Sequence, residues 1–177
     1  MSWWERQFKK ALQGDIELEG DLIFNTSGGG LCYGDMSVKD NATTTTLNSS
    51  GKVQVTIFNT DGPSNNATPD HTNDHITIVK AGFYLVIVSI SVANNAAQNH
   101  DINVGLFKNN GATQFTNIHA HRTLTGGSGD KGSISLSGII DTAVDDTIEV
   151  WTNTDTAADR IVTFGDVTLS IVQVGGT

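Results

Sequence analysis

The sequence lacks several features that stabilise, anchor or export proteins. Cys32 is the only cysteine among 177 residues, so no disulfide can form within the chain, and we expect a small buried side chain there. No run of about 20 apolar residues, the length that a membrane-spanning helix needs, is present. Residues 1–14 have neither the apolar segment nor the small-residue cleavage site of a secretory signal. We therefore expect synthesis in a cytoplasm.

Positive charge and catalytic motifs are also scarce. Ten Lys and Arg stand against 19 Asp and Glu, a net charge of -9, which disfavours nucleic acid as a partner because phosphate contacts need cations. The nucleophile elbow Gly-x-Ser-x-Gly, the zinc motif His-Glu-x-x-His and the phosphate-binding Gly-Lys-Ser/Thr are absent. No zinc or EF-hand spacing is present either. We predict a protein that is not an enzyme and that uses no cofactor or metal.

One apolar stretch, residues 75–93, dominates the sequence. After a turn at Lys80-Ala81-Gly82, almost every residue from 83 to 92 is β-branched, aromatic or leucine. Alternation places Val86, Val88, Ile90 and Val92 on one face and Leu85, Ile87, Ser89 and Ser91 on the other. The second face begins apolar and ends polar. We predict a central strand that is buried on both sides at its start.

The rest of the chain has the pattern of short strands joined by Gly, Asn and Asp turns. Residues 52–58 alternate with apolar side chains inward, and Asn109-Asn110-Gly111 is a strong hairpin signal. Residues 59–74 and 126–132 are polar and predict loops. About eight strands after residue 50, without crossover helices, predict an all-β fold: an antiparallel double-sheet jelly-roll sandwich.

Residues 2–13 predict a short N-terminal amphipathic helix. Trp4, Phe8, Ala11 and Leu12 recur at helical spacing, and a helix this short is marginal alone in water. Its docking residues would be the apolar Trp3, Trp4, Phe8 and Leu12 and the cationic Arg6, Lys9 and Lys10. Docking on another subunit or a larger assembly is favoured, while packing on its own domain and lying on a membrane surface stay open.

Gly-Asp units follow this helix. Residues 14–19 and 20–25 each begin with Gly-Asp, and a third unit begins at Gly34-Asp35. Such units predict either an extended arm, whose core is shared between neighbouring chains, or an ordinary β-meander. We therefore predict an anchor helix at 1–13, an arm and linker at 14–50, and the jelly-roll domain at 51–177.

Several motifs taken in order resemble the jelly roll shared by the complement globular heads and tumour necrosis factor. These are Ile76-Thr77-Ile78 with Gly82-x-Tyr84, Gly105-Leu106-Phe107-Lys108-Asn109-Asn110-Gly111, Ser133 to Gly138, Asp145 to Val150 and Phe164 to Leu169. Asp145-Asp146 stands where the family usually has Gly-Asp. The resemblance covers about Lys52 to Val174. It implies a homotrimer with a binding or structural role rather than a catalytic one. Tyr84 and Phe164 are its aromatic candidates for the trimer interface.

Histidines add two further candidate sites. His119 and His121 share one face of the predicted strand at residues 114–124, and on a threefold axis they would repeat into a metal or anion cage. The favoured interpretation is that both are ordinary exposed strand histidines. His71 and His75, with Asp70 and Asp74, form a polar cluster without a recognised metal spacing.

The N-terminal region narrows the resemblance further. Bacterial and phage members are similar in having a short N-terminal anchor and a linker like GDLIFNTSGGGL before the jelly roll. This implies a bacteriophage structural protein on the virion surface, a trimeric capsid decoration or attachment protein held by other virion proteins. A tail-fibre tip that recognises a host glycan or protein through the loops at 59–74 and 126–132 is the first alternative. A soluble cellular binding module is the second.

Overall fold

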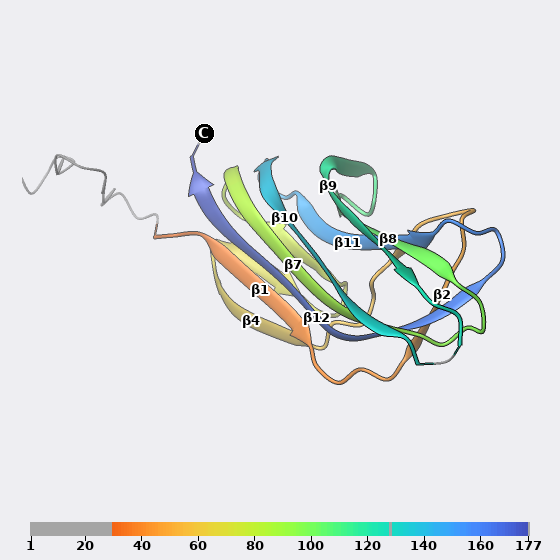
Figure 1. Ribbon diagram of the computed structural model, residues 1–177. Coiled ribbons are helices and arrows are strands. Elements are labelled where there is room, and N and C mark those ends of the chain that lie inside the picture. Colours follow the sequence, from red (N-terminus) through yellow and green to blue (C-terminus); the bar gives the residue numbers. More distant parts are fainter. Residues whose placement is uncertain (1–29, 128, 177) are drawn as a thin grey trace, which may run out of the picture. The chain divides into compact units, whose positions relative to one another are not determined.

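A computed structural model describes residues 30–127 and 129–176, which form two antiparallel β-sheets (Figure 1). The predicted anchor helix at 1–13 and the first two Gly-Asp units lie outside these residues. No helix in the described part has the length and apolar character needed to cross a membrane. The all-β, double-sheet prediction is confirmed.

The first sheet has the strand order β10-β7-β12-β1-β4, with β2 paired to β12. Every pair in it is antiparallel. Its strands are β1 (Tyr33–Val38), β2 (Thr44–Leu47), β4 (Thr60–Asn65), β7 (Gly82–Asn94), β10 (Lys131–Thr142) and β12 (Arg160–Gly175).

The second sheet has the order β5-β6-β11-β8-β9, with β3 paired to β11. It is also antiparallel throughout. Its strands are β3 (Val53–Gln54), β5 (Ala67–Asp70), β6 (His75–Ile78), β8 (His100–Lys108), β9 (Thr113–Leu124) and β11 (Thr147–Thr154). Consecutive strands often belong to different sheets, which is the connectivity expected of a jelly roll.

The predicted central strand is β7, which lies between β10 and β12. Val86, Val88 and Ile90 are fully buried between the sheets, as the alternation predicted. Each such side chain contributes roughly 1.5–3 kcal/mol by leaving water. The opposite face is different, because Ile87 keeps 48% of its surface exposed. The prediction that β7 is buried on both sides at its start is therefore wrong for the single chain.

The sandwich begins earlier in the sequence than predicted. β1 pairs with β12 along six residues, and β2 pairs with the beginning of β12. Met36 and Leu47 from these strands are fully buried, and so is Cys32 just before them. The boundary predicted at residue 51 is wrong, and the third Gly-Asp unit, Gly34-Asp35, belongs to β1 rather than to an arm.

Residues 59–74 were predicted as a loop, but they form two edge strands. β4 pairs only with β1, and β5 pairs only with β6, at the outer edge of each sheet. Pro63 and Pro69 lie in these strands. Edge strands tolerate proline because one side of the backbone has no ladder partner, so prolines and polar residues did not exclude strands here.

The hairpin predicted between β8 and β9 is confirmed. Asn109, Asn110 and Gly111 have φ values of 58°, 58° and 70°, the left-handed region that Asn and Gly tolerate best. Asp145 has φ 67°, at the turn where the resembled family usually has glycine. The turn therefore requires a left-handed backbone conformation at this position, and here an aspartate adopts it.

We predict that a chain starting at Gly30 folds and that a chain starting at Gly51 does not. The shorter chain loses β1 and β2 and with them Cys32, Met36 and Leu47. Removing such buried side chains costs about 2–5 kcal/mol each, against a total stability of about 5–15 kcal/mol for a typical domain. Circular dichroism during heating checks this. Cooperative unfolding of the chain that starts at Gly51 would contradict the observed domain boundary.

Candidate functional site

The outer face of the first sheet carries a group of exposed apolar side chains. Phe83, Ile87 and Ile139 are 40%, 48% and 58% exposed, and all belong to β7 or β10. The outer face of an antiparallel sheet is normally polar where it meets water. Large exposed apolar groups that cluster usually mark an interaction surface.

Strand register places these residues in rows across the sheet. Ile139 of β10 pairs with Leu85 of β7, Leu85 pairs with Val172 of β12, and Val172 pairs with Tyr33 of β1. One row across four neighbouring strands is therefore apolar throughout. We call the outward side chains of Tyr33, Phe83, Leu85, Ile87, Ile139 and Val172 the apolar face.

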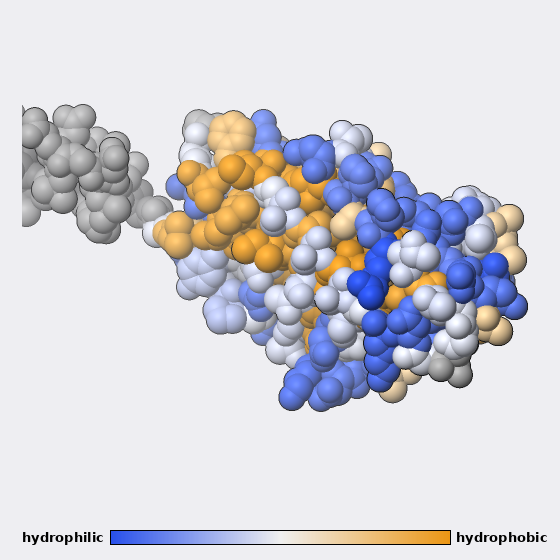
Figure 2. Space-filling view, in the orientation of Figure 1, coloured by the Kyte–Doolittle hydropathy of each residue, from blue (hydrophilic) through white to orange (hydrophobic). Residues whose placement is uncertain are grey.

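The apolar face ends abruptly along the strands. In the row beyond Ile87, Ser89 pairs with Ser135 on one side and with Thr168 on the other. Figure 2 shows apolar residues gathered over the end of this sheet where β12 finishes, and polar residues over the remainder. The face is thus a patch with a polar border, the pattern expected of an interface that leaves the rest of the sheet in water.

The predicted trimer-interface residues lie elsewhere. Tyr84 and Phe164 are both 0% exposed, inside the sandwich. The Tyr84 hydroxyl donates a hydrogen bond to the backbone oxygen of Lys80 at 2.7 Å, and burial raises its pKa. The two residues expected at a subunit interface therefore lie inside the core of the single chain, which they stabilise.

The residues next to Tyr84 in sequence are the ones that reach the outer face of the sheet. Successive side chains of a strand point to opposite faces, so Phe83 and Leu85 point outward because Tyr84 points inward. The signal was already visible in the apolar beginning of the second face of β7. Row partners such as Ile139 and Val172 could not be found from the sequence, because their position depends on strand pairing.

His119 and His121 lie on β9, and both are exposed, so the predicted shared face is confirmed. His119 Nδ1 is 3.0 Å from the backbone oxygen of Thr116. Across residues 30–127 and 129–176, no three His, Cys, Asp or Glu side chains are grouped so as to hold a metal ion.

The His and Asp residues between β5 and β6 serve local structure. His71 Nδ1 lies 2.8 Å from Asp61 Oδ2. Asp70 accepts hydrogen bonds from the backbone of Thr72 and from Asn73, and these bonds, led by the Asn73 side chain, lower its pKa. Asp74 Oδ1 accepts a hydrogen bond from the Phe58 backbone at 3.1 Å. Each of these carboxylates is thus engaged by the protein itself.

Asp146 is engaged in the same way at the β10–β11 turn. Its carboxylate accepts hydrogen bonds from Lys108 Nζ at 2.7 Å, Asn109 Nδ2 at 2.8 Å and the Ala143 backbone at 3.0 Å.

The predicted anchor residues lie outside the described part of the chain, so the anchor stays a prediction. These residues are Trp3, Trp4, Arg6, Phe8, Lys9, Lys10 and Leu12.

Comparison with known proteins supports the fold. No family model matches the sequence, and no curated protein matches it. A solved structure described as Eiger TNF from S. frugiperda matches with a TM-score of 0.56 and 13% sequence identity, over 84% of this chain and 96% of that one. The chain has a tumour necrosis factor-like jelly-roll fold. At this identity the likeness shows the fold alone.

We predict that Asp74→Asn stabilises the protein at neutral pH. Burial raises the pKa of Asp74 from 3.8 to about 6, so the native state binds more protons than the unfolded state between these values, and stability falls as the pH rises through them. Asparagine keeps an oxygen for the Phe58 backbone and tolerates the φ of 55°. Allowing for solvent screening, the gain above pH 7 should be about 1 kcal/mol.

Denaturant unfolding at about pH 4 and pH 7 measures this. Asp70→Asn is the matched control with the opposite sign, because the lowered pKa of Asp70 contributes stability at neutral pH that is lost on acidification. Equal pH dependence in the wild type and the Asp74→Asn variant would show that Asp74 is not penalised by burial.

Proposed function

We propose that this chain is a non-enzymatic structural protein that assembles as a homotrimer through the apolar face and is attached to a bacteriophage particle by its N-terminal segment. The observation that carries the assembly is the row Ile139, Leu85, Val172 and Tyr33, which is apolar across four strands. Leaving such a row in water forfeits roughly 25 cal/mol for each Å² of apolar surface.

A second copy of the chain is the favoured occupant of the apolar face. Copies of the chain are always present at the concentration of the face itself, and the tumour necrosis factor-like motifs of the sequence imply subunits packed side by side about a threefold axis. In a closed ring of three, each interface joins two different surfaces of neighbouring copies. The apolar face of one chain would supply one of these two surfaces, and a different surface of the neighbouring copy would meet it.

Attachment to a particle is supported by the sequence of the N-terminal region. Two tryptophans, Phe8 and Leu12 give residues 1–13 a large apolar load. Net charge there is +2, from Arg6, Lys9 and Lys10 against Glu5, opposite to the net charge of the whole chain. An acidic or apolar groove on a virion protein would satisfy both features, with the aromatic residues supplying affinity and the cations supplying orientation.

We predict that Ile139→Asp converts the trimer into monomers. The substitution places a charge within the proposed interface, where desolvation is costly. The single-chain fold should be kept, because Ile139 is more than half exposed. Light scattering at micromolar concentration should change from three chain masses to one.

Ser135→Asp is the matched control, since Ser135 is an exposed residue on the same face of the same strand. This variant should remain trimeric. A wild-type chain that is monomeric at these concentrations would refute the assembly, and a trimeric Ile139→Asp variant would remove the apolar face from it.

We predict that Trp4→Ala combined with Phe8→Ala abolishes attachment to the particle while leaving the trimer and its melting temperature unchanged. Aromatic residues at the centre of an interface contribute about 2 kcal/mol or more each. Co-sedimentation of purified protein with particles lacking it measures attachment. Gln13→Ala, on the opposite side of the predicted helix, should attach normally. Normal occupancy by the double variant would exclude the helix as the anchor.

A further inference from the structure

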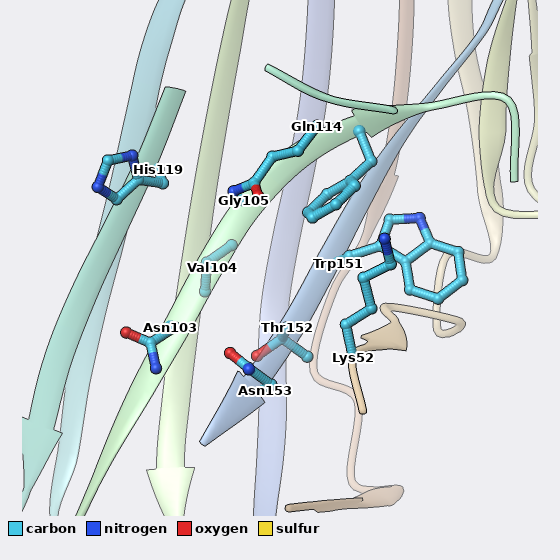
Figure 3. Close-up of a pocket in the computed structure, with 10 residues that line it drawn as sticks. Lys52, Asn103, Val104, Gly105, Gln114, His119, Trp151, Thr152 and Asn153 are labelled. Carbon is cyan, nitrogen blue, oxygen red and sulfur yellow. The ribbon is translucent and has the colours of Figure 1, made fainter. Parts of the chain in front are cut away.

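The outer face of the second sheet contains a hollow of about 240 Å³, lined from β8, β9 and β11 and by Lys52 (Figure 3). This volume is enough for one small ring rather than for an extended chain. The hollow belongs to the opposite sheet from the apolar face. Assembly through the first sheet and binding at the second are therefore separate properties.

A glycine and a bulge create the hollow. Gly105 of β8 pairs with Trp151 of β11 on one side and with His119 of β9 on the other, and it has no side chain to fill the space between them. Immediately afterwards the register shifts, since Phe107 pairs with Gln114. Bulges of this kind bend a strand and redirect its side chains. A Cβ at Gly105 would lie 3.0 Å from Gln114 Nε2 and from the Phe107 ring.

One wall of the hollow is aromatic and held in place. Trp151 Nε1 donates a hydrogen bond to Glu149 Oε2 at 2.8 Å, and the ring lies 6.1 Å from that of Phe107 at 56°. Glu149 is 2% exposed and also accepts hydrogen bonds from the backbone of Asn110 and Gly111. The tryptophan is therefore positioned before any ligand arrives, which lowers the entropic cost of binding.

The hollow also carries amide groups that have no hydrogen-bond partner in the described part of the chain. Asn103 and Asn153 face each other across the β8–β11 pair, and Gln114 lies above Gly105 (Figure 3). None of the three side chains makes a hydrogen bond to a described residue, whereas the amide of Asn94 makes three such bonds. Each amide offers both donors and an acceptor, so the group can hold a ligand that needs both.

The charge of the hollow is opposite to that of the whole molecule. Its described lining includes one cation, Lys52, and no acidic residue, in a chain of net charge -9. Lys52 Nζ lies 4.1 Å from the centre of the Phe107 ring and donates a hydrogen bond to the Gly111 backbone at 2.5 Å. An ammonium has three donors, so two remain for an anionic group of a ligand.

We infer that this hollow binds a single sugar ring that carries a carboxylate, as part of an acidic glycan. The aromatic wall offers apolar ring surface beside the Lys52 ammonium, which lies over both rings, and this suits the C–H groups of a pyranose ring. The amides match hydroxyl groups, which donate and accept at once. The Lys52 ammonium matches the carboxylate. A peptide carboxylate would use Lys52 but would leave the paired amides without hydroxyl partners.

The test uses the full-length chain with Trp3→Phe and Trp4→Phe, which leaves Trp151 as its only tryptophan. Its emission is followed during titration with the methyl glycosides of glucose, galactose and mannose and of the three matching uronic acids. At least one uronic acid should shift the emission with a Kd of about 1 mM. The matching neutral sugar should bind about tenfold more weakly, because it lacks the charge-assisted contact.

Two variants and one control locate the effect. Lys52→Gln should bring the affinity for the uronic acid down to that for the neutral sugar, while Lys80→Gln, which changes the net charge equally on a remote turn, should leave both affinities unchanged. Asn153→Ala should weaken both sugars by about tenfold, and, as its side chain has no partner among the described residues, the melting temperature should stay as in the parent.

Several results would overturn the inference. These are no response to any of the six glycosides, an equal response to acetate, or the same loss of affinity in Lys80→Gln as in Lys52→Gln. Binding that persists in the monomeric Ile139→Asp variant is expected, because all the lining residues come from one chain. A failed trimer and a failed sugar site are therefore distinguishable.

Discussion

The alternation of side chains along β7 is the constraint on which the rest of the structure depends. Val86, Val88 and Ile90 point into the sandwich and are fully buried, as expected of apolar side chains that leave water on folding. Once they do, Phe83, Leu85 and Ile87 must point outward, since a shift of one residue would exchange the two faces completely. The pairing of β7 with β10 and β12 then extends the apolar outer face to both neighbours.

The two outer faces of the sandwich offer different chemistry. The first sheet presents an apolar row with a serine and threonine border, which suits contact with another protein surface. The second presents a small hollow with an aromatic wall, amides and a lysine, which suits a polar ligand. A jelly roll supports this division because its two sheets share one core, so residues on one outer face can change without disturbing the other.

The hollow also offers a site for the alternative role, recognition of a host receptor. Residues 59–74, expected to form a binding loop, are instead paired as β4 and β5 at the edges of the two sheets. A ligand site on a strand surface is more rigid than one on a loop. If the acidic-glycan site is correct, a particle-bound trimer would display three copies of it, and weak single contacts would combine through multivalency.

Periodicity and turn chemistry in the sequence determined the fold class, the central strand and the Asn109-Asn110-Gly111 hairpin, because these depend on neighbours within a few residues. Local patterns also indicated that the second face of β7 begins with apolar residues, although the two predicted interface residues, Tyr84 and Phe164, lie in the core. Only the tertiary structure decided that β1 and β2 belong to the sandwich, that the proline-containing segment forms edge strands, and that Gly105 lies between Trp151 and His119. Those features depend on pairing between strands far apart in the chain, and the energy of such pairing comes from packing partners that no local pattern identifies.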